Sequence, residues 1–246
     1  MSTQPDGLEI SFSALFDTHA HEEKLRGESM RLIENNHELA HRLDIIQRAM
    51  AVVLRYTLDH TARTADESTM QLLGIRLFNA GASGTKLALS GYYQTAFQQA
   101  RDIMETGYLL DFFRTSPHQI GVWRTADRPL RRKLFDPVKI RTALDERDGD
   151  VEKRRAKQYG ELSELASHAS YRGFRLTVRG GVGELGPFVE EINLKAWLHE
   201  MVLRFGPSAV MYANQFPDAE ESLEHELRVF GTMLVQGYKA PVGERK

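Results

Sequence analysis

The chain has 246 residues, of which 41% are hydrophobic and 27% charged, and its formal net charge is −2. This is the composition of an ordinary globular protein, and the small net charge creates no overall field that would attract an anionic partner. The absence of cysteine excludes disulfides, thiolate metal sites and cysteine nucleophiles, and it suits a reducing compartment.

The sequence indicates neither a secretory signal nor a membrane span. The first residues are polar and acidic and lack an apolar region of the signal type. The longest apolar run, 49–54, is far shorter than the ~20 residues that cross a bilayer. We therefore expect a cytoplasmic protein with no membrane partner, folded as a single domain over residues 1–246.

A long helix is predicted from 22 to 60, after a lead segment at 1–18. Its apolar side chains recur mostly at alternating spacings of three and four residues, which predicts a coiled-coil-like seam. The seam residues are Leu32, Leu39, Leu43, Ile46, Met50 and Val53. Something of similar length must cover them, either another helix of this chain or a second copy in a homodimer through the 22–60 helix.

Two further helices are predicted on either side of a glycine-rich break at 79–84. The first runs from about 66 to 78. The second, from 86 to 114, carries small residues at helical spacing, so we expect it to be the central helix. Asp111 falls on its buried face. Because an unpaired buried carboxylate is costly, Asp111 must reach solvent or find a partner.

A stretch with three prolines follows, and residues 116–137 are predicted to form a long loop. Further helices are expected after it, at 137–144, 151–168, 190–205 with a restart beyond Pro207, and 217–238.

Between the last helices, β-prone alternation and a glycine-rich turn predict one hairpin near 171–189. The predicted fold class is therefore all-α. We expect a multi-helix bundle with a long N-terminal helix and one small β-hairpin.

The string from His37 to His41 fits the pattern H-E-x-x-H. In that pattern two histidines one helical turn apart bind zinc, and the glutamate, here Glu38, is the general base. A zinc-dependent hydrolase is therefore one hypothesis. The two histidines lie opposite the apolar seam, however, which is typical of a solvated helix face. A third ligand is also needed, and His60, a downstream candidate, points away from the pair on a helical wheel.

Two features raise the hypothesis of an RNA-binding or RNA-cleaving protein. Arg55 and His60 have the R-x4-H spacing found in helical ribonucleases of the HEPN type. Within 116–137, Arg131 and Arg132 accompany Trp123, and basic with aromatic residues suits backbone contact and base stacking. The alternative for this segment is a loop held on the acidic helix faces of its own bundle.

A second group of polar residues is predicted near the central helix. Arg101 and Glu105, at i and i+4, can form an ion pair that either keeps the bundle in register or lines a polar pocket with His168. Tyr159 and Ser163 belong to the same dense polar segment as His168. The histidine is a candidate proton shuttle, because its ordinary pKa lies near neutrality, or else a helix cap.

These residues also carry a resemblance. R-x-x-x-E at Arg101, followed by Y-x-x-L-S-x-x-x-S-H-x-S from Tyr159, is similar to a group of bacterial helical proteins catalogued only as a domain of unknown function. The similarity covers roughly residues 85–205. It implies a helical fold and marks Arg101, Glu105 and His168 as positions to test, but it implies no reaction.

The sequence thus favours a non-catalytic binding or interaction module. The first alternative is RNA binding or cleavage, with His168 and Arg101 or Arg55 and His60. The second alternative is a zinc-dependent hydrolase that uses His37, Glu38 and His41.

Overall fold

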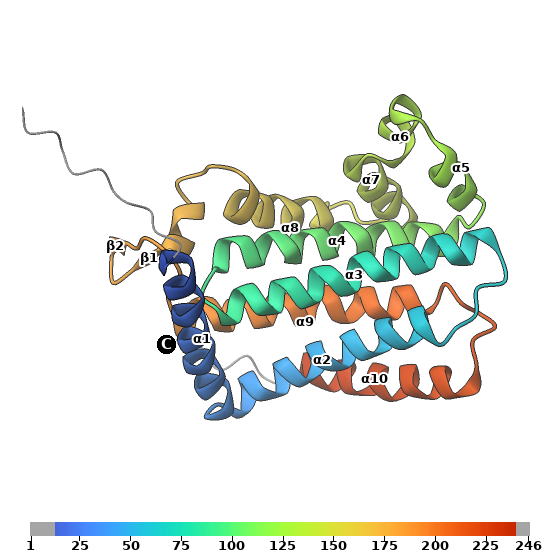
Figure 1. The fold of residues 1–246 in the computed structure, drawn as a ribbon. Coiled ribbons are helices and arrows are strands. Elements are labelled where there is room, and N and C mark those ends of the chain that lie inside the picture. Colours follow the sequence, from blue (N-terminus) through green and yellow to red (C-terminus); the bar gives the residue numbers. More distant parts are fainter. Residues whose placement is uncertain (1–12, 240–246) are drawn as a thin grey trace, which may run out of the picture.

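The structure is a computed structural model that describes residues 13–239. Four long helices form a bundle in which each helix packs against two neighbours, in the order α2, α3, α4, α9 (Figure 1). Their bounds are α2 His37–Leu58, α3 Ala65–Leu89, α4 Tyr93–Thr115 and α9 Glu191–Ala213.

The remaining helices surround this bundle. α1 crosses one end, α10 packs on α2 and α9, and α7 and α8 lie on α4, while the short α5 and α6 lead into α7 (Figure 1). Their bounds are α1 Ser13–Glu34, α5 Gln119–Thr125, α6 Arg128–Phe135, α7 Pro137–Asp148, α8 Arg154–Leu162 and α10 Glu221–Lys239.

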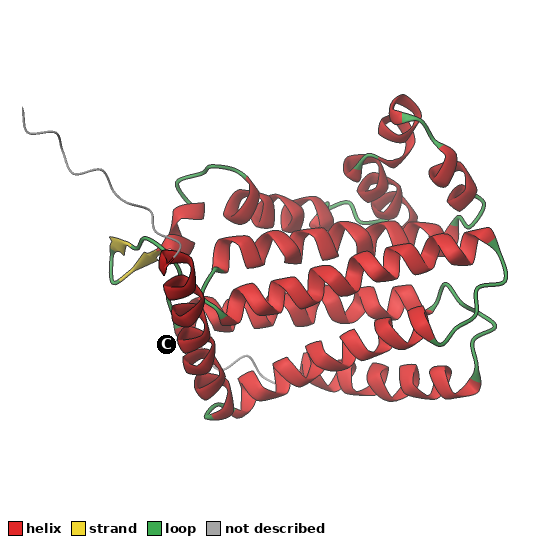
Figure 2. Cartoon of the chain, viewed as in Figure 1, coloured by secondary structure: helices red, strands yellow, loops and turns green. Residues whose placement is uncertain are grey.

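The all-α prediction is confirmed, because the described strands form a single two-stranded hairpin (Figure 2). Strands β1 (Val178–Arg179) and β2 (Val182–Gly183) are shorter than expected. The 3₁₀ helix η2 (Gly173–Thr177) occupies most of the segment that was expected to be the first strand. Across residues 13–239, no helix is long and apolar enough to cross a membrane.

The expected single helix over 22–60 is two helices, and 13–18 begins α1 instead of belonging to a lead segment. The break falls at Asn36, whose extended backbone ends the helical run and whose side chain accepts hydrogen bonds from the backbone N–H groups of Glu38 and Leu39. Asparagine is a strong N-cap because its side chain satisfies these otherwise unpaired donors. The apolar seam therefore extends over two helices instead of the one that was predicted to carry it.

The seam of α2 is covered within the chain. Leu39, Ile46 and Val53 are almost fully buried, and α2 packs against α3, α9 and α10. A homodimer is therefore not needed to cover this seam.

The predicted break at 79–84 is wrong, because α3 continues to Leu89. The glycines of this segment allow close packing and do not form a turn. A Cβ on Gly81 would lie only 2.8 Å from the ring of Phe205. The chain turns at Gly91, which has a φ of +85°. Glycine adopts this left-handed conformation without the steric cost that a side chain brings.

The predicted long loop at 116–137 is also wrong, since α5 and α6 lie within it. The prolines start helices here. Asp127 caps α6 ahead of Pro129, and Asp136 caps α7 at Pro137. Proline suits the first helical turn because the N–H group that it lacks would be unpaired there anyway.

The other predicted boundaries shift more modestly. The helix expected at 151–168 begins at Arg154 and ends in a π turn, η1 (Ser163–Ser167). α9 continues through Pro207 where a restart was expected. α4 and α9 approach so closely beside this proline that a Cβ on Gly107 would lie 2.2 Å from Ser208 Oγ. This contact forms part of the floor of the pocket described next.

Candidate functional site

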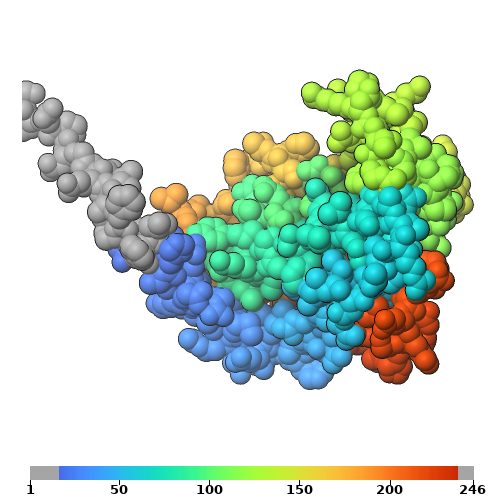
Figure 3. Space-filling model, turned by 45° about the vertical axis from the view of Figure 1, so that its right-hand side comes forward, coloured from blue at the N-terminus to red at the C-terminus, as the bar shows by residue number. Residues whose placement is uncertain are grey.

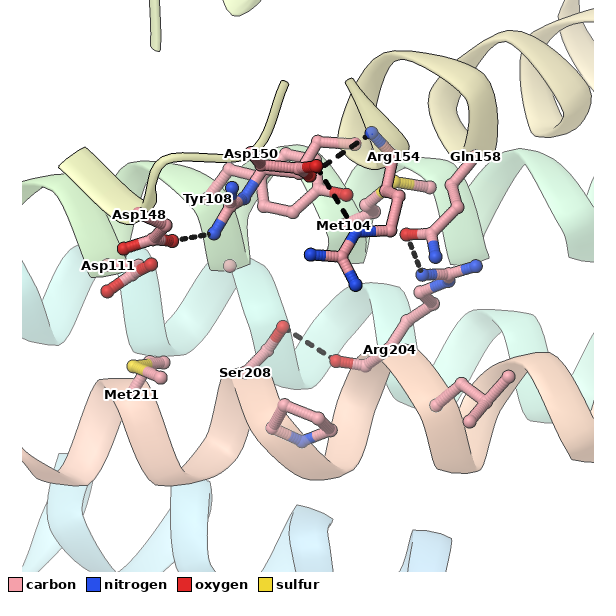
Figure 4. Close-up of a pocket in the computed structure, with 14 residues that line it drawn as sticks. Met104, Tyr108, Asp111, Asp148, Asp150, Arg154, Gln158, Arg204, Ser208 and Met211 are labelled. Carbon is pink, nitrogen blue, oxygen red and sulfur yellow. Dashed lines mark hydrogen bonds and ion pairs between the residues drawn. The ribbon is translucent and has the colours of Figure 1, made fainter. Parts of the chain in front are cut away.

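A pocket of about 360 Å³ lies between α4, α8, α9 and the segment that joins α7 to α8 (Figure 4). Its volume falls in the range of small-molecule sites, which combine an apolar lining with a few convergent polar groups. Met104, Leu203 and Met211 contribute apolar surface. The polar lining comes from Tyr108, Asp111, Asp148, Asp150, Arg154, Arg155, Gln158, Arg204 and Ser208.

The carboxylates at one end of the pocket are already paired with arginines. Arg147 binds Asp111 through two parallel hydrogen bonds, of 3.0 Å to Oδ1 and 2.9 Å to Oδ2. Its Nε also donates to Asp148 at 2.7 Å, and Arg155 donates to Asp148 and Asp145. Asp111 therefore has the partner that its burial requires, on a helix distant in sequence.

The pKa of Asp148 is lowered from 3.8 to about 2, mainly by the hydrogen bond from Arg147 and further by Arg155. The ionised carboxylate therefore stabilises the fold above its ordinary pKa, and this contribution is lost as the pH falls toward 2.

The Asp148→Asn variant is expected to unfold more easily at neutral pH, by about 1 kcal/mol, since partial exposure screens the ion pairs. Near the lowered pKa of about 2, the carboxyl of the native protein becomes neutral as well, so the difference should shrink. Urea unfolding of both proteins at the two pH values measures this. A difference that does not change with pH would contradict it.

Some arginine donors in the pocket remain unpaired. The side chain of Asp150 is 5% exposed and accepts hydrogen bonds from the backbone N–H and from Nε of Arg154. The two terminal nitrogens of Arg154 have no partner in the described chain. They point into the space above Ser208 (Figure 4). Arg204 pairs with Glu200 through Nε at 3.1 Å and with Gln158 through Nη1 at 2.8 Å, and its Nη2 is likewise unpaired.

Tyr108 contributes a hydroxyl group that is buried and has no hydrogen-bond partner among residues 13–239. Burial raises the pKa of this hydroxyl. The charges of Arg204, Arg155 and Arg141 partly oppose that effect, and the charge of Asp145 adds to it. Tyr108 therefore brings a buried hydroxyl without a partner in the described chain to the pocket lining.

Arg141 is itself unusual, because it is only 7% exposed and its Nε and Nη1 have no partner in the described chain. Its guanidinium stacks on the ring of Tyr159, 3.8 Å from the centroid. Such stacking offsets part of the cost of burying the charge.

The structure brings Arg101, Glu105 and Tyr159 together. Arg101 lies 3.0 Å from Glu105, and Tyr159 donates to Glu105 Oε1 at 2.8 Å. Arg101 also donates to the Tyr159 hydroxyl and to Ser167 Oγ, the latter at 2.8 Å. Because Arg141 stacks on Tyr159, this cluster adjoins the surroundings of Tyr108.

His168 is not part of this cluster. Its side chain is exposed and forms no hydrogen bond or ion pair within the described residues, while its backbone N–H donates to the carbonyl of Ser163 and closes the π turn. Ser167, the preceding residue, contacts Arg101 instead. Ser163 is buried, and its hydroxyl lacks a partner in the described part of the chain.

The proposed zinc ligands lie on α2, with His37 exposed and His41 partly exposed, while Glu38 pairs with Arg42. Within residues 13–239, no group of three or more histidine, aspartate or glutamate side chains could hold a metal ion. The two histidines therefore lack a third ligand there.

Arg55 and His60 have separate partners. Arg55 pairs with Asp59 and, at 3.1 Å, with Glu226 of α10. His60 is buried against the ring of Phe216 and lies 3.5 Å from Glu67. No contact in the described chain joins the two residues into the pair that cleavage would need.

The basic segment keeps its charges exposed but turns its aromatic rings inward. Trp123 packs on Phe113, with ring centroids 5.8 Å apart, and Phe135 is buried. Arg131 and Arg132 are exposed on α6. The rings that were expected to stack on bases are thus used to pack α5 and α6 on the bundle.

No family model, curated protein or solved structure matches the chain. The class of protein therefore follows from the fold and the pocket alone: an α-helical bundle with a charged pocket on one side. Sequence reasoning missed Tyr108, Arg154 and Arg204 as site residues. The charged segment at 145–150, between the helices expected at 137–144 and 151–168, was a signal, but it was interpreted only as a break between them.

Proposed function

We propose that the protein is a non-catalytic cytoplasmic binding module whose pocket between α4, α8 and α9 holds a small molecule with a carboxylate or phosphate group. The observation that carries the proposal is the buried, unpaired hydroxyl of Tyr108 in a pocket that Arg154, Arg155 and Arg204 also line. A buried donor without a partner is costly, and an acid group of a ligand would satisfy it.

The balance of hydrogen bonds favours an anion over a cation. The carboxylates of Asp111, Asp148 and Asp150 already accept from arginines. The terminal nitrogens of Arg154 and Nη2 of Arg204 still have donors to offer. Guanidinium groups match carboxylate and phosphate oxygens in geometry as well as in charge.

Calorimetric titration with inorganic phosphate and with citrate tests the proposal. Arg204→Gln is expected to weaken binding about ten- to a hundredfold, because one charge-assisted hydrogen bond is worth ~1.5–3 kcal/mol. Tyr108→Phe should also weaken binding without lowering stability, since the hydroxyl it removes has no partner within residues 13–239.

The matched control is Arg228→Gln. Arg228 pairs with Glu224 at i−4 on α10, as Arg204 pairs with Glu200 on α9, but it does not line the pocket. It should bind both probes as the unaltered chain does. Absence of binding by both anions, or equal binding by the two arginine variants, would overturn the proposal.

RNA cleavage and zinc hydrolysis have less support. Neither Arg101 with His168 nor Arg55 with His60 is in contact in the described chain, and His37 and His41 lack a third ligand there.

A further inference from the structure

Helix α6 is the most exposed helix of the lobe that α5, α6 and α7 form at one end of the bundle. Seven of its eight residues, all except Phe135, are exposed. It packs mainly against α7, and the lobe projects from the body of the molecule (Figures 1 and 3). The sequence of α6, RPLRRKLF, contains four cations and no acid.

The arrangement of these residues around the helix is amphipathic. Leu130 and Leu134, at i and i+4, share one face, and each is 38% exposed. Lys133 and Arg131 flank the two leucines, each about 60° away around the helix. Val138, just beyond α6, is 55% exposed. An aliphatic strip with cations on both sides thus faces solvent.

We propose that α6 docks this lobe on an anionic lipid surface, with the leucines in the interface and Lys133 and Arg131 on the headgroups. Amphipathic helices with apolar residues on one face and Arg and Lys on the polar face bind anionic bilayers in this orientation. The inference concerns a surface remote from the pocket and does not depend on the proposed ligand. It departs from the expectation of no membrane partner, which rested on the lack of an apolar run long enough to cross a bilayer.

Two observations favour lipid over RNA as the occupant. The exposed leucines gain nothing from a phosphate backbone, whereas a bilayer interface buries them. The aromatic rings that single-stranded RNA would stack on, Trp123 and Phe135, are packed against Phe113.

Co-sedimentation of the full chain with phosphatidylcholine vesicles, with and without phosphatidylserine, tests this docking. Binding is expected only with phosphatidylserine, and it should weaken as salt rises. Arg131→Gln/Lys133→Gln, which removes the two cations that flank the leucines, should weaken it about thirtyfold, the effect of two cations at the lipid surface. Leu130→Ser/Leu134→Ser should weaken it as well while leaving the charge unchanged.

The matched control is Arg31→Gln/Lys157→Gln, which removes two exposed cations from α1 and α8 and should bind as the unaltered chain does. Circular dichroism checks that each variant is folded. Equal sedimentation with both vesicle types, none with either, or unchanged binding by the Arg131/Lys133 or leucine variants would overturn the proposal. Vesicle binding that does not depend on the leucines, together with binding of labelled single-stranded RNA that depends on Arg131 and Lys133, would identify RNA as the occupant instead.

Discussion

The Gly91→Ala variant is expected to lose about 2–4 kcal/mol of unfolding free energy. About 1 kcal/mol comes from forcing a side chain into the left-handed conformation of this turn, where φ is +85°. A further ~1–3 kcal/mol comes from overpacking, since the new Cβ would lie 2.4 Å from the carbonyl oxygen of Phe188. That backbone cannot move easily, because Phe188 is buried against Tyr93 and the N–H of Glu190 donates to the Tyr93 hydroxyl.

The matched control for this variant is Gly231→Ala. Gly231 lies inside α10, and a Cβ there would meet nothing within 4 Å. Alanine at an open helical position should raise stability by about 0.5–1 kcal/mol. Urea unfolding followed by circular dichroism gives both values. If Gly91→Ala were as stable as the unaltered chain, the turn would not be constrained by the segment at 188–190.

The Arg147→Met variant is expected to lose about 2–4 kcal/mol. It leaves Asp111, whose side chain is 12% exposed, with Arg114 as its only cationic partner in the described chain. Removing one member of a buried pair costs ~3–5 kcal/mol, and the remaining arginine reduces that figure. The same change removes the ion pair between Arg147 and Asp148, which lines the pocket.

A double-mutant cycle separates two contributions to this loss of unfolding free energy: the Asp111 carboxylate left without Arg147, and the packing lost with the arginine side chain. Asp111→Asn in the Arg147→Met background should recover much of the loss, because the charge has been removed. Arg48→Gln, which breaks the exposed pair with Asp44, should cost no more than about 0.5 kcal/mol. If Arg147→Met resembled Arg48→Gln, the Asp111 pair would be no more than a surface contact.

The fold class could be predicted from the sequence because helical periodicity is local. Apolar spacings of three and four residues identified most of the helices, and the burial of Asp111 implied a partner. The breaks between helices were harder to predict. Asn36 ends a helical run by its own side chain, which a search for apolar periodicity does not detect. Pro129 starts a helix where it was interpreted as a sign of a loop, whereas Pro137 begins a helix as expected.

Of the predicted site residues, Arg101, Glu105 and Tyr159 are in contact, while His168 is not. Arg101 and Glu105 are one helical turn apart, so their pairing needs only a helix. Their contact with Tyr159 depends on how α8 packs on α4. The roles proposed for these residues stay predictions.

The sequence by itself therefore determined the helical class, the apolar faces and the ion pairs within single helices. Only the tertiary structure decided which glycine turns the chain and which residues form the pocket. Gly81 and Gly91 differ in the residues that pack against them, and those residues are distant from both glycines in the sequence. Tyr108 and Arg204 become neighbours because α4 and α9 touch at Gly107 and Ser208, a contact between residues about a hundred positions apart.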